Sequence, residues 1–484
     1  MKRILLSFLF VAAMFSLGSC SGLPQGTGGG GGGNANLSLT LSDAPPAGAT
    51  FLSFNTPITA ITLTPSTGTD VSVFSPPTPA SFDLIRLQSD SASIGKFQVA
   101  AGTYTKINVF VGSPSTIFVN NSSATIGSCA VNTVCSLNSG APGAISFTFT
   151  TPLVLTSGSN VGLGIEFNLN NIVTTTGGIG IDFTQANALS AVTLPRPGQA
   201  TGTLDSIEDF TGQITASTVT NGNGNITITS ATRGTLTGAV SSTTNYNGLS
   251  VGTTSACSGN ANAQCLGTGK TVSVDATVST TGVVNISEVD FLDTPAADEI
   301  EGIIYPTTTA NTFGMVVTDV VNATGNATLN PVGSGTQLTF TLDNNAAFGV
   351  DGRNLLVSST NSSFASQNDL FPGQQVMIHV KTASVTTLLN VVTDRLVLRF
   401  SRLTGTVNTV SGNAFTVQNT SAFLGTFNVP PGVLTFPGVT NFDNFSALSD
   451  LATGNPTVSF RALYLNPNSA ANGQPFMAAK VRKH

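Results

Sequence analysis

A serine within a Gly-x-Ser-x-Gly pattern is the first place in this sequence where covalent chemistry could occur. Residues 248–252 read Gly-Leu-Ser-Val-Gly and put Ser250 at the position of a nucleophile. A nucleophile elbow needs a helix directly after the serine, and residues 253–263 do not suggest one. In a chain with 51 glycines the pattern is also easily met by chance. We therefore predict that Ser250 is not catalytic.

A serine nucleophile would also need a general base, and His379 is the only internal histidine, because His484 ends the chain. Residues 376–381 alternate Val, Ile and Val with Met, His and Lys, as on a strand whose wetter face carries His379. A solvated strand histidine is the simpler interpretation. We expect a protein without catalytic activity.

Acidic residues concentrate only along residues 288–301. Calcium requires six to eight oxygen ligands, and this run offers weak candidates without EF-hand spacing. A pair of glycosidase carboxylates could be drawn from the same run. A solvated edge between two units is the commoner arrangement, so we predict neither metal nor cofactor. The calcium candidates are Asp290, Asp293, Asp298 and Glu299, and the run also holds Glu288 and Glu301.

Two glycine-rich segments fail as phosphate-binding loops. Residues 267–271 read Gly-Thr-Gly-Lys-Thr, but the first glycine of the loop motif would fall on Gln264. Gly28 to Gly33 match the Gly-x-Gly-x-x-Gly pattern of dinucleotide-binding loops only because every residue of the run is glycine, and no helix follows them. The sequence pI near 4.8 leaves no basic field for phosphates, so we expect no nucleic-acid partner.

The N-terminus has the order of a secretory leader. Lys2 and Arg3 precede an apolar run, residues 4–15, that is too short to span a bilayer. Leu17-Gly18-Ser19-Cys20 then resembles the lipobox of bacterial lipoproteins. That resemblance implies a diacylglyceryl group on Cys20, cleavage after Ser19, and a membrane partner reached through the lipid. Ser21, in place of an Asp, implies the outer membrane; the alternative is an ordinary signal peptide with an incidental cysteine.

With Cys20 carrying lipid, four cysteines remain in two short-range pairs. An exported protein keeps its disulfides, so we predict Cys129 bonded to Cys135 and Cys257 bonded to Cys265. A zinc site would need four ligands, and the chain offers only two histidines besides these widely separated thiols.

The composition favours an all-β fold. Charged residues are only 8% of the chain, against about 25% in an ordinary soluble domain. Ser, Thr, Asn and Gly dominate the polar residues, and these are poor helix formers that suit strands and turns. At 40% hydrophobic residues and a net charge of -6, the chain should fold.

The sequence predicts an N-terminal β-sandwich followed by two or three small β-barrel or sandwich units. Alternation of Leu with Ser and Thr marks a strand from Leu37, and Asp43-Ala44-Pro45 ends it, with Asp43 expected to cap a turn. Pro195-Arg196-Pro197-Gly198 reads as a linker. The expected order is signal peptide 1–19, lipidated Cys and Gly-rich tether 20–36, sandwich 37–195, and β units 200–296, 297–400 and 401–484.

The last three units share one pattern. Gly-Gln-Ile at residue 212, Gly-Ile-Ile at 302 and Gly-Thr-Val at 405 each open a unit and are each followed by an alternating apolar strand. The openings lie 90 and 103 residues apart, which suits independent barrels or sandwiches rather than a solenoid. Duplication explains the pattern; a single divergent domain is the alternative.

Three motifs in the first domain carry a resemblance to a family. They are Asp43-Ala44-Pro45, Phe82-Asp83-Leu84, and Ala101-Gly102-Thr103-Tyr104 before Lys106-Ile107-Asn108-Val109. This stretch, about a third of the chain, resembles family 4382 of the domains of unknown function, whose members are bacterial lipoproteins. The later units resemble family 5666 of the same class. Neither resemblance implies an established activity.

Together these features predict a non-catalytic binding or structural module of the cell envelope, with an envelope polysaccharide or protein as possible partner. Two alternatives stay open, a polysaccharide-binding module and a secreted hydrolase that uses the acidic run. An exposed aromatic strip would favour the first, and paired carboxylates in a cleft would favour the second.

Overall fold

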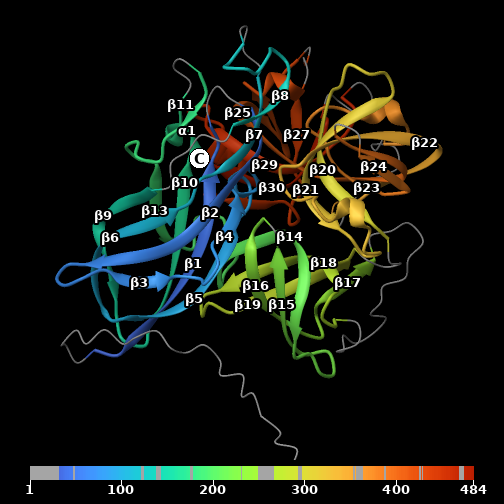
Figure 1. Cartoon of the computed structure of the whole chain (residues 1–484). Coiled ribbons are helices and arrows are strands. Elements are labelled where there is room, and N and C mark those ends of the chain that lie inside the picture. The colour runs from blue at the N-terminus through green and yellow to red at the C-terminus, as the bar shows by residue number, and fades with distance from the viewer. Residues whose placement is uncertain are drawn as a thin grey trace, which may run out of the picture. The chain divides into compact units, whose positions relative to one another are not determined.

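The computed structural model describes residues 32–46, 50–120, 125–137, 143–174, 178–230, 232–248, 266–292, 297–352, 355, 364–385, 388–424, 427, 429–467 and 474–484 (Figure 1). Every strand and core cluster reported below belongs to these residues. Strands dominate throughout, which confirms the all-β prediction. The described helices are single turns, and none of them is long and apolar enough to cross a membrane. They are α1 (Leu169–Ile172), η1 (Leu84–Leu87), η2 (Ala327–Leu329), η3 (Gln367–Asp369), η4 (Ala422–Leu424) and η5 (Leu448–Leu451).

The N-terminal domain is a sandwich of two sheets, drawn in blue to green in Figure 1. One sheet has the order β13-β10-β1-β5, in which β1 pairs with β10 in parallel. The other has the order β8-β7-β2-β6-β9, with β3 and β4 on β2. A separate two-stranded sheet pairs β11 with β12. The strands are β1 (Asn34–Ala44), β2 (Thr50–Pro65), β3 (Val71–Phe74), β4 (Ala80–Asp83), β5 (Ala92–Ala100), β6 (Gly102–Val111), β7 (Ser115–Val119), β8 (Val134–Leu137), β9 (Gly143–Leu155), β10 (Asn160–Asn168), β11 (Val173–Thr174), β12 (Gly180–Ile181) and β13 (Leu189–Leu194).

Three closed five-stranded barrels follow. The first closes through β14-β15-β16-β19-β18, the second through β20-β21-β22-β25-β23, and the third through β25-β26-β27-β30-β29. The strands are β14 (Thr203–Ser217), β15 (Gly224–Ser230), β16 (Gly234–Val240), β17 (Asn245–Gly248), β18 (Thr271–Ser279), β19 (Val284–Phe291), β20 (Glu299–Tyr305), β21 (Thr312–Val321), β22 (Gln337–Val350), β23 (Gln375–His379), β24 (Thr382–Val385), β25 (Leu389–Ser411), β26 (Ala414–Gln418), β27 (Gly432–Leu434), β28 (Asn441–Asp443), β29 (Thr457–Tyr464) and β30 (Phe476–Lys483).

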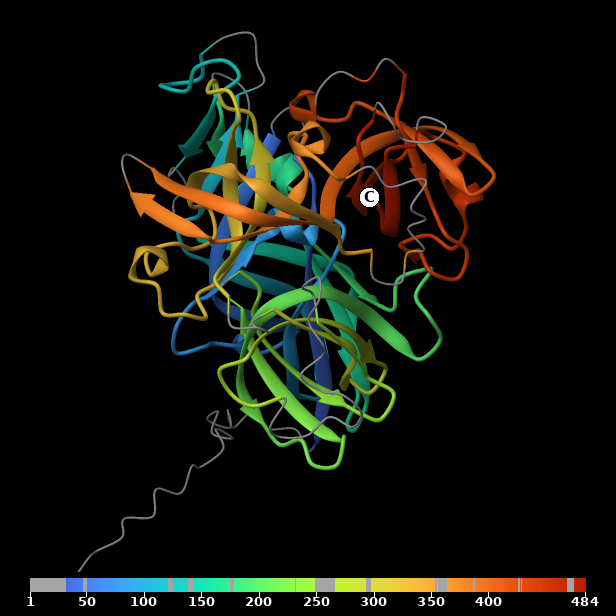
Figure 2. The ribbon, with the colours of Figure 1, turned by 90° about the vertical axis from the view of Figure 1, so that its right-hand side faces the viewer.

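All three barrels have the same topology. In each, the first strand pairs antiparallel with the second and fourth, and the third pairs in parallel with the fifth. This is a Greek-key barrel of the OB type. Figure 2, turned by 90° from Figure 1, shows the green and yellow strands of the first barrel curving around one axis. The common topology agrees with the repeated sequence pattern.

The opening glycine of each unit lies where the first strand crosses closely over the second. A Cβ on Gly212 would lie 2.4 Å from the carbonyl oxygen of Thr229, and one on Gly302 would lie 2.5 Å from that of Val316. On Gly405 the nearest atom would be the Cβ of Val417, at 2.9 Å. The missing side chain thus permits the close approach that closes each barrel.

The long strand β25 is shared by two barrels. Its first half pairs with β22 and β23, and its second half pairs with β26 and β29. Residues 400 and 401, between which the sequence suggested a division, therefore follow one another within a single continuous strand.

Candidate functional site

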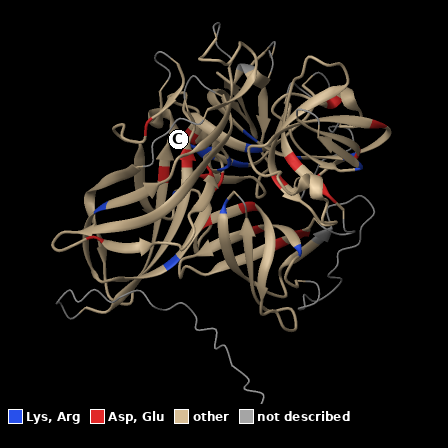
Figure 3. Cartoon of the chain, viewed as in Figure 1, with Lys and Arg blue, Asp and Glu red and all other residues tan. Residues whose placement is uncertain are grey.

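Charged side chains gather where the domains meet rather than on the outer loops. In a chain of only 17 Lys and Arg and 23 Asp and Glu, 22 charged residues are buried among those described. Many of the blue and red segments of Figure 3 accordingly lie where the ribbons approach one another. Burial of a charge is costly unless it is paired and hydrogen-bonded, so the partners of each group decide what the cluster does.

Asp90 and Arg233 form the centre of this ionic cluster. Nη2 of Arg233 donates to Oδ2 of Asp90 at 2.9 Å, and both side chains are at most 1% exposed. The other nitrogen, Nη1, donates to the backbone carbonyls of Glu208 and Asp209. Burial alone would raise the pKa of Asp90, but Arg233 and Lys480 outweigh it and hold that pKa below its usual range. The pair joins the sandwich to the first barrel.

The C-terminal strand β30 adds two further cations. Arg482 donates from Nε to Asp443 at 2.7 Å and from Nη1 to the backbone carbonyls of Leu87 and Asp90. Nζ of Lys480 donates to the hydroxyl of Ser206 at 2.9 Å. Burial opposes ionisation of Asp443, but Arg482 and Lys480 hold its pKa well below the usual range. The third barrel is thus bonded both to the sandwich and to the first barrel.

The second barrel is connected through Arg86 of η1, which bonds to Asp319 of β21. Burial raises the pKa of Asp319 to about 6, although Arg86 opposes the rise. Asp83 caps η1 through the backbone N–H of Ile85 and also accepts from the N–H of Phe54 at 2.8 Å. Residues 83–86 therefore fix one corner of the sandwich against this barrel.

Asp43 does not cap an exposed turn, contrary to the expectation from Ala44-Pro45. It lies within β1 opposite Phe167 and is fully buried, and neither of its carboxyl oxygens has a hydrogen-bond partner among the described residues. Burial and the nearby Glu166 raise the pKa of Asp43 well above its usual range. The parallel pairing of β1 with β10 carries the carboxyl group inward, an arrangement that the local Asp-Ala-Pro pattern does not encode.

A pocket of about 350 Å³ opens beside this ionic cluster, a volume within the usual range for small-molecule sites. The sandwich contributes the start of β2 and η1, the second barrel contributes β20 and β23, and the third contributes β25 and the segment after β26. Its walls are mostly apolar. They include Pro45, Pro46, Phe51, Leu52, Ile85, Ile303, Leu403, Phe423 and Leu424.

Nine of the nineteen lining residues are polar, and most of these are hydrogen-bonded to one another. Thr404 donates to Gln88 Oε1 at 3.2 Å, and the hydroxyl of Ser401 accepts from the N–H of Gln375 at 2.9 Å. The hydroxyls of Thr50 and Ser421 share a hydrogen bond that connects β2 to the third barrel. Arg402 is the charged residue of the lining, and its side chain is only 4% exposed.

Of the two candidates for serine catalysis, the structure describes His379. Ser250 lies outside the described residues. His379 lies at the end of β23, 28% exposed at its side chain, and its Nδ1 is 2.6 Å from Oδ1 of Asp394 on β25. The expected strand position is correct, but the imidazole is paired with a carboxylate rather than simply solvated.

The acidic run is not a solvated edge, which corrects that interpretation. Its described members are all buried: Glu288 and Asp290 on β19, Asp298 directly before β20, and Glu299 and Glu301 on β20.

Two of the calcium candidates have partners in the protein. Asp298 accepts from the N–H of Thr324 at 2.8 Å, and Glu299 pairs with Arg395. Asp290 lies on β19, opposite Ser273 of β18. Asp293 is outside the described residues, and within them no group of three or more His, Cys, Asp or Glu is placed to hold a metal ion.

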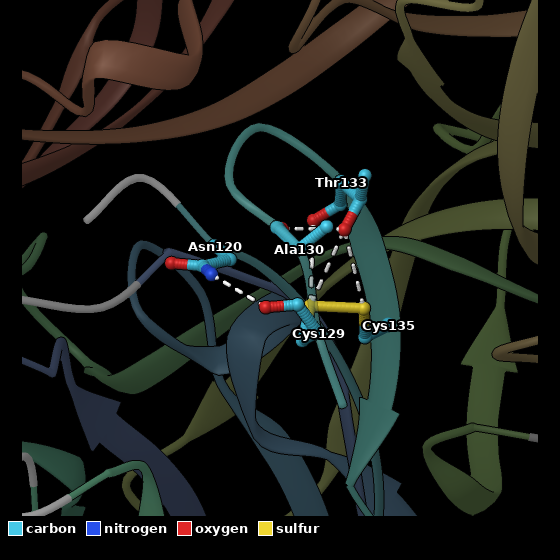
Figure 4. Close-up of a disulfide and its surroundings, with 5 residues drawn as sticks. All are labelled: Asn120, Cys129, Ala130, Thr133 and Cys135. Atoms are coloured by element: carbon cyan, nitrogen blue, oxygen red, sulfur yellow. Dashed lines mark hydrogen bonds between the residues drawn. A yellow bond between two sulfur atoms is a disulfide. The ribbon is translucent and has the colours of Figure 1, made fainter. Parts of the chain in front are cut away.

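Cys129 and Cys135 form a disulfide, as the spacing predicts (Figure 4). The bond closes the loop before β8, where Asn120 Nδ2 donates to the carbonyl of Cys129 at 2.8 Å and Thr133 donates to that of Ala130. Cys20, Cys257 and Cys265 lie outside the described residues.

Sequence reasoning missed both the ionic cluster and the pocket. The available signal was the position of charged residues within apolar strands: Arg399 and Arg402 interrupt the apolar run of β25, and Lys480 and Arg482 do so in β30. Their partners lie up to several hundred residues away, and no local pattern identifies them. The predicted linker at residues 195–198 is also part of the packed structure, because Arg196 is buried and donates to Ser42 at 3.0 Å.

Comparison with known proteins adds one family. Residues 34–198 match the model of a family described as "Domain of unknown function (DUF4382)", which confirms the resemblance of the N-terminal domain. A search of curated proteins gave no match. Among solved structures, the chain is similar to Drosophila Unr CSD456, with 10% identity, coverage of 57% of this chain and 97% of that chain, and a TM-score of 0.12.

Proposed function

We propose that this protein is a non-catalytic binding module of the cell envelope, held in the outer membrane by lipid on Cys20. The pocket carries the proposal. Its volume of about 350 Å³ and its combination of apolar walls with hydrogen-bonded polar groups are those of a small-molecule site, and three of the four domains build it. The leader and lipobox supply the location.

The first test concerns the anchor. Cells grown with labelled palmitate should incorporate the label into the wild type and into Ser21→Asp but not into Cys20→Ala. Fractionation should place Ser21→Asp in the inner membrane, because an Asp after the lipidated cysteine gives that address in bacterial lipoproteins. Label retained by Cys20→Ala would disprove the anchor.

The second test concerns binding and catalysis. Residues 32–484 contain every described strand and core cluster, so this fragment is suited to a thermal-shift screen against envelope glycans, lipids and small metabolites. We expect one ligand class to raise the melting temperature, since a ligand that binds only the folded state stabilises it. Turnover of ester, peptide or glycoside substrates that is lost in Ser250→Ala or His379→Ala would refute the non-catalytic function.

A polysaccharide-binding module is the second candidate, supported by the barrel topology. Barrels of the OB type bind oligosaccharides on the face of their second and third strands. In this chain those strands are β15 with β16, β21 with β22, and β26 with β27. If glycans still raise the melting temperature when the pocket is blocked, the polysaccharide-binding function is favoured over small-molecule binding in the pocket.

A further inference from the structure

Arg402 has an incomplete set of partners for a buried guanidinium. Its Nη1 donates to Gln375 Oε1 at 3.2 Å, whereas Nε and Nη2 have no hydrogen-bond partner among the described residues. The nearest carboxylate oxygens to Nη2 are those of Asp90 at 3.7 Å and Asp209 at 3.8 Å. Both distances exceed a hydrogen bond. Buried donors without acceptors are costly. Arg86 and Arg233 also have such nitrogens, but among these arginines Arg402 is the one that lines the pocket.

The two nearby carboxylates are committed more closely to other cations. Asp90 accepts from Arg233 at 2.9 Å, and Asp209 bonds to Arg461. Burial and the nearby Arg86 lower the pKa of Arg402 to about 10, although Asp209 and Asp90 oppose the fall. The guanidinium is still charged at neutral pH, and neither carboxylate lies within hydrogen-bond distance of its Nη2. An anion at this point would be stabilised.

The geometry of the two unused donors restricts the anion. Nε and Nη2 form one side of the planar guanidinium fork, which matches the two oxygens of a carboxylate. A dianion such as a phosphate monoester would place its second charge beside Asp90 and Asp209, a repulsive arrangement at these distances. Phe51, Phe423 and Leu424 line the rest of the pocket and suit a hydrocarbon.

We propose that the pocket binds a small amphipathic carboxylate, with its head group on Nε and Nη2 of Arg402 and its hydrocarbon part against Phe51, Phe423 and Leu424. This inference rests on the proposed binding function and assigns it a ligand class. Gln88 and Thr404, which also line the pocket, are already hydrogen-bonded to each other.

Isothermal titration of residues 32–484 with octanoate tests the inference, with 1-octanol and octyl phosphate as probes of the same chain length. Octanoate should bind at least about tenfold more tightly than either, as expected for a charge-assisted bidentate pair. Equal binding of octanoate and 1-octanol would overturn the role of Arg402, and tighter binding of octyl phosphate would overturn the choice of a carboxylate.

Variants separate the head group from the pocket. Arg402→Met should weaken octanoate at least about tenfold and leave 1-octanol unchanged, because only the charged contact is lost. If Arg402→Met does not fold, Arg402→Lys, which keeps the charge but not the fork, should still weaken octanoate measurably. Unchanged octanoate affinity in a folded Arg402 variant refutes the inference.

Thr420→Trp, at the partly exposed rim, should abolish binding of both probes, and Thr215→Trp on the first barrel should abolish neither. Octanoate binding that survives Thr420→Trp also refutes the inference. If octanoate does not bind but a neutral ligand raises the melting temperature of the protein, the carboxylate ligand class is rejected and the binding function is kept. Absence of any ligand in the wider screen would reject the binding function itself.

Discussion

At the scale of single residues, the ionic cluster makes stability depend on complete pairing. Replacing Arg233 with Met leaves Asp90 buried without its closest cation. Removing one partner of a buried pair costs about 3 to 5 kcal/mol, because the remaining charge keeps its desolvation penalty. We expect Arg233→Met to lower the free energy of unfolding by about that amount in urea titrations followed by circular dichroism.

Lys381 and Asp343 provide the matched control. They form an ion pair whose side chains are 45% and 31% exposed. Water already solvates both groups, so Lys381→Met should lower the free energy of unfolding far less than Arg233→Met does. Equal losses in Lys381→Met and Arg233→Met would contradict the distinction between the cluster and the surface pair.

Two carboxyl groups of the cluster should give opposite pH dependences. Burial raises the pKa of Asp319 to about 6, against about 4 in the unfolded chain, so its contribution to stability falls as pH rises through that window. Because the Asn side chain does not titrate, the stability of Asp319→Asn relative to the wild type should increase from pH 4 to 6 and then level off. Urea titrations at each pH measure the difference.

Asp443 should show the reverse. Burial opposes its ionisation, but Arg482 holds the pKa below the unfolded value, so its contribution is present above about pH 4 and is lost as the pH falls further. The deficit of Asp443→Asn should therefore shrink in acid. A deficit that stays constant from pH 6 to 2 would show that Asp443 keeps its ordinary pKa.

The same residues mark the limit of what sequence could predict. Because charged residues are only 8% of the chain, the sequence predicted a weakly charged protein whose acidic run lies at a solvated edge between units. The structure instead buries Glu301 near Arg86 of the sandwich, and Asp298 against Thr324 of its own barrel. Alternation within a strand indicates which face is polar, but it does not indicate whether another domain covers that face. The pocket was unpredictable for the same reason, since three domains build it.

At the scale of elements, the glycine that opens each barrel should be the least tolerant position. Ala at 212 or 302 would bring Cβ within 2.4 or 2.5 Å of a backbone carbonyl oxygen, whereas at 405 the nearest contact is a side chain at 2.9 Å. Overpacking of this kind costs about 1 to 3 kcal/mol. We expect Gly212→Ala and Gly302→Ala to lower the midpoint of urea unfolding more than Gly405→Ala.

Gly333→Ala serves as the control, because an added Cβ there meets nothing within 4 Å. Its midpoint should stay within error of the wild type. A large loss in this variant, or none at 212 and 302, would argue against glycine-dependent barrel closure.

The elements themselves were largely predictable. Leu-x-Leu-x-Leu from residue 37 falls in β1, and the alternating residues after each opening glycine fall in β15, β21 and β26. Period-two alternation and repeated glycines are local signals, so they can be recognised in the sequence without knowledge of the tertiary structure. The pairing of β1 with β10 joins residues more than a hundred positions apart, and it was not predictable from either strand alone.

At the scale of the whole molecule, the cluster should couple the domains. Arg233 bonds the first barrel to the sandwich, Arg461 bonds the third barrel to the first through Asp209, and Arg482 bonds the third barrel to the sandwich through the carbonyl of Leu87. A chain of independent domains unfolds in several steps, so coupling of this kind should be visible in calorimetry.

We expect residues 32–484 to unfold in one calorimetric transition whose van't Hoff and calorimetric enthalpies agree. Raising the salt to about 0.5 M should leave it single, since buried pairs are screened much less than surface pairs. Combining Arg233→Met with Arg482→Met removes bonds between the sandwich and two barrels. The first barrel has a largely separate hydrophobic cluster, whereas the cluster of the third barrel includes Leu52, Ile117 and Val119 of the sandwich and stays joined to it. The double variant should therefore resolve into at least two transitions, whereas Lys381→Met should not. Several transitions in the wild type would mean that the ionic cluster joins the domains without making them unfold together.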